Sequence, residues 1–132
     1  MQTFLPYPDF KRSAESLDRK RLGNQRREAL VLLHGGWPNH PASRMWQGYF
    51  YQLACYGIVI CKEWIRRGYK DSCQPKFAAE LLKYQNTGFP PWFGNPDFHR
   101  SHQSNLIRKL ESHYRPLFPN VPDDLPYIWP VQ

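Results

Sequence analysis

A single carboxylate, Glu28, stands at the end of a strongly basic segment. Residues 17–30 read LDRKRLGNQRREAL, and five basic side chains fall within the nine positions 19–27. Such a run is typical either of a solvated helix face or of a surface that binds a polyanion such as nucleic acid. A carboxylate weakens the attraction of that surface for a polyanion. Its presence there favours a chemical role for Glu28 as an acid or base.

The α-amino group of Met1 is the candidate nucleophile. An α-amine has a pKa of about 7.8, compared with about 10.4 for lysine, so far more of it is uncharged at neutral pH. Residues 1–10 contain Pro6 and Pro8, which predict an extended arm lying across the basic helix near Glu28. An amine that attacks a sugar C1′ gives a Schiff base, and a carboxylate then moves protons and stabilises the cationic intermediate. Met1 and Glu28 are therefore the predicted catalytic residues.

The composition indicates an anionic partner. Lys and Arg total 18 against 11 Asp and Glu, giving a formal net charge of +7 and a pI near 9.5. Aromatic residues make up 16% of the chain, which excludes a disordered basic tail. The N-terminus lacks the pattern of a secretory signal, and no apolar segment is long enough to cross a membrane. The three cysteines lack C-x-x-C spacing, so we expect a reducing, cytoplasmic location without disulfides.

Helical patterns dominate the chain, and no strand pattern is convincing. The expected fold is all-α, a compact single domain over residues 1–132 with about four helices. A first helix is predicted from an N-cap at Ser13 to about His34, where Gly35 and Gly36 end it. A long central helix of about 26 residues, from Pro41 to the stop at Gly68, would span about 40 Å. The remaining predicted elements are a helix over 75–85, a loop over 86–96, a helix over 96–114 and a proline-rich extended tail after Arg115.

Two faces of the first predicted helix can be told apart by their spacing. Leu22, Ala29 and Leu33 repeat at helical intervals and are expected to face a core. Arg21, Gln25 and Glu28 lie at i, i+4 and i+7, so they form a polar stripe that carries both basic and acidic groups. The central helix has its own apolar stripe, formed by Met45, Trp46, Tyr49, Leu53, Gly57, Ile60 and Trp64.

Other chemistry-bearing residues have more ordinary explanations. His99 and His102 are at i, i+3, a spacing compatible with metal binding, but no acidic or Cys partner stands at ligand spacing; no metal and no cofactor are expected. His40 precedes a helix, so capping and substrate contact both remain open. Cys55 and Cys61 are predicted to be buried as small apolar side chains. Core or lid packing is favoured over base stacking for an aromatic cluster of Trp92, Phe93 and Phe98.

Three segments resemble the pyrimidine-dimer DNA glycosylase family, founded by the bacteriophage endonuclease V. SLDRKRLGNQRREAL resembles the family's first-helix segment, with Arg27-Glu28 matching its Arg-Glu pair. HPASRMWQGYFYQLACYGIVICKEWIRRGYKDSC resembles the middle helix, which closes with an acid-x-x-basic-basic-Gly-aromatic pattern at residues 63–69. FHRSHQSNLIRKL resembles the last helix, which is followed by an aromatic tail like YIWP. Together these segments cover most of the chain.

The resemblance implies a metal-free DNA N-glycosylase with AP-lyase activity, in which an N-terminal amine is the nucleophile and the helix glutamate, here Glu28, is the acid/base. It places basic contacts to DNA on the first and last helices. The predicted DNA-binding residues are Lys20, Arg21, Gln25, Arg27, His40, Arg44, Arg108 and Lys109.

One departure from the family leaves the nucleophile open. In the founding enzyme the initiator methionine is removed and a small second residue supplies the amine, whereas residue 2 here is Gln2. Either Met1 supplies the amine or Glu28 activates a water molecule.

The predicted function is excision of damaged or modified pyrimidines, with pyrimidine dimers first, from double-stranded DNA by a monomeric enzyme. Two alternatives remain: a non-catalytic nucleic-acid-binding protein, and a glycosylase that acts on hypermodified bases of foreign DNA.

Overall fold

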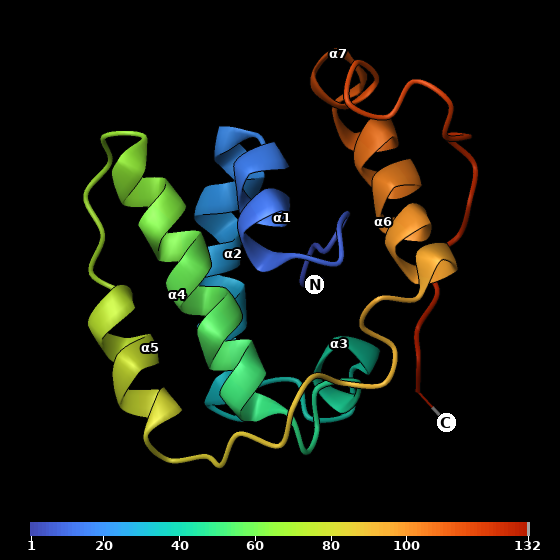
Figure 1. Ribbon diagram of the computed structural model, residues 1–132. Helices are drawn as coiled ribbons and strands as arrows, with labels where there is room; N and C mark the ends of the chain where they lie inside the picture. The colour runs from blue at the N-terminus through green and yellow to red at the C-terminus, as the bar shows by residue number, and fades with distance from the viewer. Residues whose placement is uncertain (132) are drawn as a thin grey trace.

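The chain folds into helices joined by short loops and extended segments (Figure 1), and the structure, a computed structural model, describes residues 1–131. Within these residues there are seven helices and no strand, which confirms the all-α class; the predicted count of about four helices was too low. The helices are α1 (Phe10–Ser16), α2 (Arg19–Leu33), α3 (Pro41–Arg44), α4 (Phe50–Arg66), α5 (Gln74–Leu81), α6 (Pro96–Lys109) and α7 (Glu111–Tyr114). None of them is long and apolar enough to cross a membrane.

The first helical segment begins earlier than predicted because its N-cap is Asp9. The Asp9 carboxylate accepts a hydrogen bond from the backbone N–H of Arg12 at 2.8 Å, which satisfies a donor at the start of α1. Ser13, the predicted N-cap, lies inside α1 instead. Its hydroxyl accepts from the backbone N–H of Tyr7 and donates to the Tyr7 carbonyl, so it fastens the end of the N-terminal arm to α1.

The helix predicted over residues 13–34 is divided into α1 and α2. Leu17 has extended backbone angles, with φ −73° and ψ 139°, and its side chain is fully buried. The guanidinium of Arg67, 50 positions away, donates to the Leu17 carbonyl at 2.8 Å. The backbone N–H of Asp18 bonds to the hydroxyl of Tyr114 at 2.9 Å. The break is therefore stabilised by long-range contacts that have no local sequence signature.

The single long helix predicted over residues 41–67 is also divided, into α3 and α4. Residues 45–49 form the connection, and Gly48 has a φ of +85°, a value that residues with a Cβ rarely adopt. Met45 and Trp46 are buried within this connection, so the apolar stripe still reaches the core although the backbone turns. The helical spacing of the apolar residues favours one continuous helix, but burial of Met45 and Trp46 in the core favours the turn that is observed.

The later helices also end earlier than predicted. α5 stops at Leu81 rather than 85, and α6 stops at Lys109. Leu110 is extended, with φ −157° and ψ 83°, and the short α7 follows it. The tail after Arg115 contains no helix up to residue 131, as its prolines predicted.

α4 is the central helix of the core and packs against α1, α2 and α5. Leu53, Tyr56 and Ile60 on α4 are fully buried. Gly57 permits the close approach of α5, because a Cβ at this position would lie 2.2 Å from the ring of Phe77. The apolar stripe expected on the central helix is thus confirmed at its buried positions.

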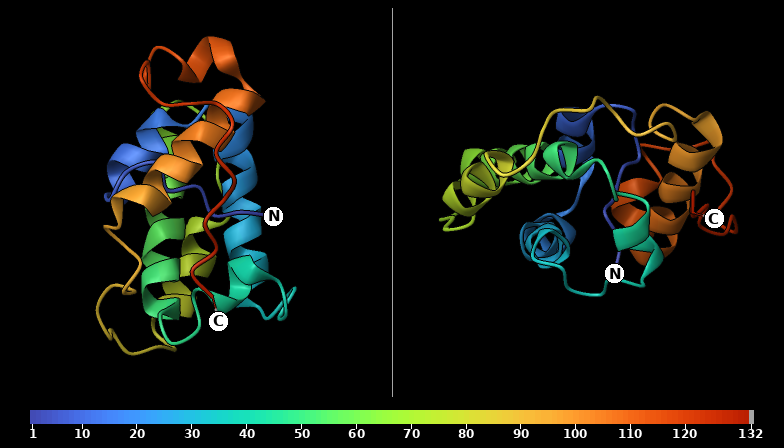
Figure 2. Two further views of the ribbon diagram at one scale, coloured as in Figure 1. Left: turned by 90° about the vertical axis from the view of Figure 1, so that its right-hand side faces the viewer. Right: turned by 90° about the horizontal axis from the view of Figure 1, so that it is seen from below.

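The N-terminal arm lies between α6 and the group formed by α1, α2 and α4 (Figures 1 and 2). The C-terminal tail runs along the outer side of α6, in front of that helix in the left view of Figure 2. The first residues of the chain are therefore placed next to both the basic helix α2 and the tail.

Candidate functional site

Side chains from α6 hold the middle of the N-terminal arm. His102 Nδ1 accepts from the backbone N–H of Leu5 at 3.0 Å, and His99 Nδ1 donates to the Leu5 carbonyl at 2.7 Å. The donor role of His99 follows from its other ring nitrogen, Nε2, which accepts from the backbone N–H of Gly94. Burial lowers the pKa of His102 to about 3, and burial also lowers the pKa of His99. Both rings are therefore neutral at physiological pH and serve to clamp the arm.

Gln25 of α2 holds the first residues of the arm and Glu28 together. Its side-chain Oε1 accepts from the backbone N–H of Phe4 at 3.0 Å and lies 2.7 Å from the hydroxyl of Tyr56. This fixes the orientation of the amide, so that Nε2 donates to the carbonyl of Gln2 at 2.9 Å and to Glu28 Oε2 at 3.1 Å. Gln25 is only 1% exposed. A contact between its amide and DNA, as predicted, would require one of these bonds to break.

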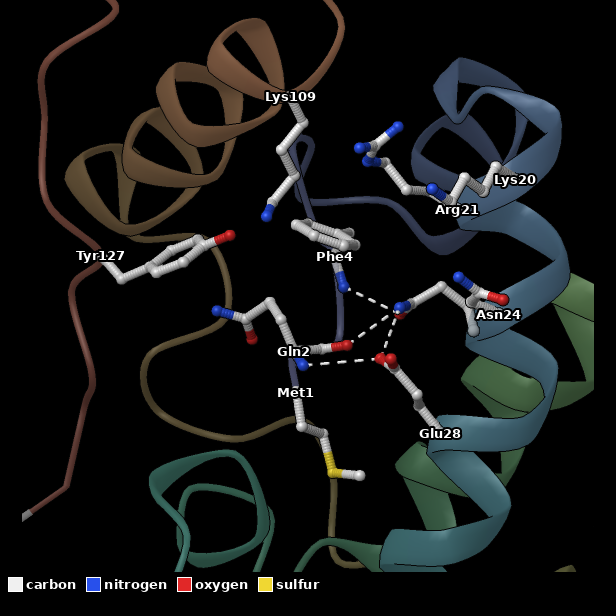
Figure 3. A pocket seen from close by; sticks show the side chains of 10 residues that line it. Met1, Gln2, Phe4, Lys20, Arg21, Asn24, Glu28, Lys109 and Tyr127 are labelled. Carbon is white, nitrogen blue, oxygen red and sulfur yellow. Dashed lines mark hydrogen bonds between the residues drawn. The ribbon is translucent and has the colours of Figure 1, made fainter.

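Glu28 receives only neutral donors. Besides the Gln25 amide, the backbone N–H of Gln2 points at Glu28 Oε2 from 3.5 Å (Figure 3). Among residues 1–131, no Lys, Arg or α-amine lies within 4.0 Å of this carboxylate. Met1 is 39% exposed and lies at the same end of the arm. The carboxylate is held in place without a counter-ion, and it therefore remains available to a substrate.

A cavity of about 250 Å³ opens beside Glu28 between α2, the arm, the end of α6 and the tail. Its lining consists of Met1, Gln2, Phe4, Lys20, Arg21, Asn24, Gln25, Glu28, Lys109 and Tyr127. Six predicted site residues thus meet at one place, both proposed catalytic groups among them. Figure 3 shows the basic side chains Arg21 and Lys109 on the side of the cavity away from Met1.

Arg21 is oriented by a buried pair of side chains. Asp18 accepts from the Arg21 guanidinium at 3.2 Å and also from the hydroxyl of Tyr114 of α7. These hydrogen bonds and the charge of Arg21 lower the pKa of Asp18 against the opposing effect of burial. Asp18 is ionised at neutral pH, so it holds Arg21 at the cavity as an ion pair.

The other predicted DNA contacts lie outside this cavity. Arg27 lines a second cavity along α2, which shares Lys20 and Asn24 with the first one. Arg44 lines a third cavity with Trp92 and the end of the tail.

His40 and Arg108 make contacts that hold the fold together. His40 Nδ1 accepts from the backbone N–H of Ala42 at 3.0 Å, so the ring caps α3, one of its two proposed roles. Arg108 donates to the carbonyls of Asp123 and Leu125, at 2.5 Å and 2.8 Å, and thereby fastens the tail to α6.

Four lining residues were missed by the sequence analysis: Gln2, Phe4, Asn24 and Tyr127. Asn24 lies four residues before Glu28, so the helical spacing of the polar stripe could have identified it. Tyr127 had no such signal, because it belongs to the tail and reaches the cavity only through the fold. Burial raises the pKa of Tyr127 to about 12, so its hydroxyl is protonated at neutral pH and can donate a hydrogen bond.

No group of three or more His, Cys, Asp and Glu side chains among residues 1–131 is arranged to hold a metal ion. The cysteines are free; Cys61 and Cys73 are buried, whereas Cys55 is only half-buried. Trp92 and Phe98 pack in the core at a ring distance of 4.8 Å, as favoured over base stacking. The chemistry available at the cavity is therefore that of a carboxylate, an α-amine and cationic side chains.

Comparison with known families gives one result for this chain. The profile of the family described as pyrimidine dimer DNA glycosylase matches residues 1–76, more than half of the chain. The matched region contains the arm, α2 and Glu28, and it ends within α5. No curated protein and no solved structure matches the chain.

Proposed function

Because the chain belongs to the pyrimidine dimer DNA glycosylase family, we propose that it excises pyrimidine dimers from double-stranded DNA and then cleaves the abasic strand. One observation carries the catalytic part of this proposal. Glu28, at the end of a basic helix face, lies in a cavity beside the first residues of the chain and has only neutral hydrogen-bond donors.

The proposed nucleophile is the α-amine of Met1. Its nitrogen attacks C1′ of the damaged nucleotide, and the N-glycosidic bond to the base breaks. One proton of the amine passes to the leaving base and the other to the ring oxygen, as the sugar ring opens to an imine. Glu28 stabilises the cationic intermediate. It then removes a proton from C2′, and the electron pair expels the 3′ phosphate, which breaks the strand.

Chemistry at Gln2 supports Met1 as the source of the amine. If Met1 were removed, the freed α-amine of Gln2 would be able to attack its own side-chain amide carbon and expel ammonia. The product is a cyclic lactam without a nucleophilic amine. Retention of Met1 prevents this loss. Activation of water by Glu28 is the second route, and the experiment below separates the two.

The cationic rim of the cavity supports binding to double-stranded DNA. Lys20, Arg21 and Lys109 surround Glu28 from two helices, and the second cavity extends the basic surface along α2 to Arg27. Basic side chains of this kind neutralise phosphates and make affinity fall with salt. We propose that the active enzyme is a monomer.

Borohydride trapping on abasic duplex tests this mechanism. Reduction of an imine between protein and DNA leaves a stable covalent adduct, so we expect the protein to become cross-linked to the DNA. Acetylation of the α-amine, or addition of residues before Met1, should abolish the adduct.

The outcomes separate the candidate functions. Excision of the base without any adduct would mean that water is the nucleophile. Binding to DNA without excision on duplexes with cis-syn dimers, modified cytosines or uracil would identify a silent binding protein instead. Excision of modified cytosines in preference to dimers would indicate an enzyme against hypermodified foreign DNA, which requires the same catalytic pair.

A further inference from the structure

The side chain of Gln2 holds an unpaired hydrogen-bond donor at the cavity. Gln2 is 5% exposed, and its Oε1 accepts from the backbone N–H of Thr3 at 2.9 Å. Because the N–H of Thr3 needs an acceptor, the atom of the Gln2 amide that faces it must be the oxygen. The other end, Nε2, is buried and has no hydrogen-bond partner among residues 1–131. A buried donor without an acceptor destabilises the folded protein, and an acceptor on a ligand would remove that cost.

The neighbours of this nitrogen in the cavity are also donors. Figure 3 shows Nε2 of Gln2 on the side of Tyr127, away from Glu28, and the side chain of Lys109 extends into the same cavity from α6. The hydroxyl of Tyr127 is protonated at neutral pH, and within residues 1–131 it makes no hydrogen bond. Lys109 likewise has no carboxylate within 4.0 Å in that part of the chain. An amide NH₂, a phenol and an ammonium therefore present donors on this side of the cavity.

We propose that Gln2, supported by Tyr127 and Lys109, reads the carbonyl oxygens of the damaged base. This inference rests on the proposed function. Thymine- and uracil-type bases carry carbonyl oxygens at both C2 and C4, whereas cytosine carries an amino group at C4. Donors on the protein match the two carbonyls and leave an amino group facing another donor. Glu28 and Met1 act on the sugar, and Gln2 determines that a base of the thymine or uracil type is preferred.

Two substitutions at Gln2 isolate the donor. Gln2→Glu keeps an acceptor for Thr3 N–H but adds a charge, and Gln2→Met is neutral but loses that acceptor. Their only common defect is the missing Nε2 donor. Gln85→Glu, in the exposed loop after α5, makes the same chemical change outside the cavity and serves as the control.

The measurement compares three DNA duplexes: a thymine–thymine dimer, a cytosine-containing dimer and a plain abasic site. We expect both Gln2 variants to lower kcat/KM about tenfold or more on the thymine dimer. The preference for that dimer over the cytosine-containing one should shrink by a similar factor. Trapping on the abasic site should change far less, because the base that Gln2 reads is absent. Gln85→Glu should behave as the unsubstituted protein on all three.

The opposite results would overturn the assignment. Equal losses on dimer and abasic DNA would mean that Gln2 only positions the arm, and unchanged preference in both variants would mean that it does not contact the base. Failure of the unsubstituted protein on every duplex would instead remove the proposed function and this inference with it. That failure is visible without any substitution, so the two can be distinguished.

Discussion

Glu28 and Glu63 are both carboxylates set among basic residues, yet their hydrogen-bond partners are of opposite kinds. Glu63, on the side of α4 that faces α1, accepts from Arg66 at 2.6 Å and from Arg67 at 2.7 Å. Those bonds lower its pKa. Arg67 in turn donates to carbonyl oxygens at the end of α1, including that of Leu17. Within residues 1–131, the hydrogen-bond donors to Glu28 are neutral.

The difference shows how an acid that fixes the fold is distinguished from the acid that we propose to be reactive. Arg66 and Arg67 bond to Glu63, and Arg67 also bonds to carbonyl oxygens at the end of α1. This cluster therefore fixes the position of α1 relative to α4. Around Glu28, Arg21 is held by Asp18, and within residues 1–131 Lys109 has no acid partner. Glu28 shares the cavity with Arg21 and Lys109 but forms no ion pair with either of them within residues 1–131.

The acid–x–x–basic–basic–Gly–aromatic pattern at residues 63–69 now has a physical explanation. Gly68 has a φ of +97°, and the ring of Tyr69 lies 4.3 Å from that of Trp64. The acid and bases form the cluster described above. This part of the family resemblance therefore reflects how the chain turns after α4, whereas the Arg27-Glu28 match includes the carboxylate that lines the cavity.

The largest expected effect is loss of catalysis in Glu28→Gln. The amide keeps the size of the side chain but cannot transfer protons, so excision of a dimer should fall about 10²–10⁴-fold. Affinity for DNA should persist or increase, because a repelling charge is removed. Excision kinetics and binding isotherms on the same duplex measure both. Full activity of this variant would reduce Glu28 to a surface carboxylate and erase its contrast with Glu63.

As the pH falls, protonation of His102 should destabilise the protein at a higher pH than protonation of Glu63 does. His102 has a pKa of about 3 when folded and about 6.5 when unfolded, so the unfolded chain binds the extra proton between these values. The free energy of unfolding should therefore decrease as pH falls below 6.5, by roughly 3–5 kcal/mol at the acid end. His99 contributes in the same direction.

Carboxylates and histidines affect stability in different pH ranges, so their contributions can be measured separately. The pKa of Glu63 is lowered in the folded state, so its contribution is present above the unfolded value of 4.5 and is lost below it. Denaturant unfolding between pH 5 and 7 therefore isolates the histidines. His102→Gln should flatten the dependence in that range. An unchanged slope in this variant would show that the clamp on Leu5 does not control acid stability.

Glu63→Gln should reverse the pattern of Glu28→Gln. Glu63 is 5% exposed, and Arg67 would lose its only charged partner among residues 1–131, so the free energy of unfolding should fall by about 1–3 kcal/mol. Excision by the folded protein should remain close to that of the unsubstituted chain. Thermal unfolding and initial rates below the transition check both. Asp124→Asn, at an exposed acid in the tail, is the matched control and should leave the unfolding temperature unchanged.

The smallest expected effect distinguishes two adjacent basic residues at the end of α6. Lys109→Gln should lower the magnitude of the slope of log affinity against log salt by about one, because one phosphate contact is lost. Arg108→Gln should change this slope less, since the Arg108 guanidinium is bonded to tail carbonyls. Titrations of undamaged duplex at several salt concentrations measure both slopes. Equal changes would place Arg108 on the DNA as well.

The local sequence pattern was sufficient to predict the all-α class and the face of α2 that lines the cavity. Helical spacing alone put Arg21, Gln25 and Glu28 on one stripe, and their positions in the structure agree with it. The basic run and the lone acid could be recognised because both properties belong to consecutive residues. The resemblance to the family over these residues is confirmed by the family match.

Only the tertiary structure decided where the helices break and what completes the cavity. The break at Leu17 depends on Arg67 and Tyr114, and the path of the arm depends on His99 and His102. Tyr127 reaches the cavity from the far end of the chain, and Arg108 turns from it towards the tail. These contacts join residues dozens of positions apart, so their energies are absent from any local window of sequence. They become favourable only when the core has brought the segments together.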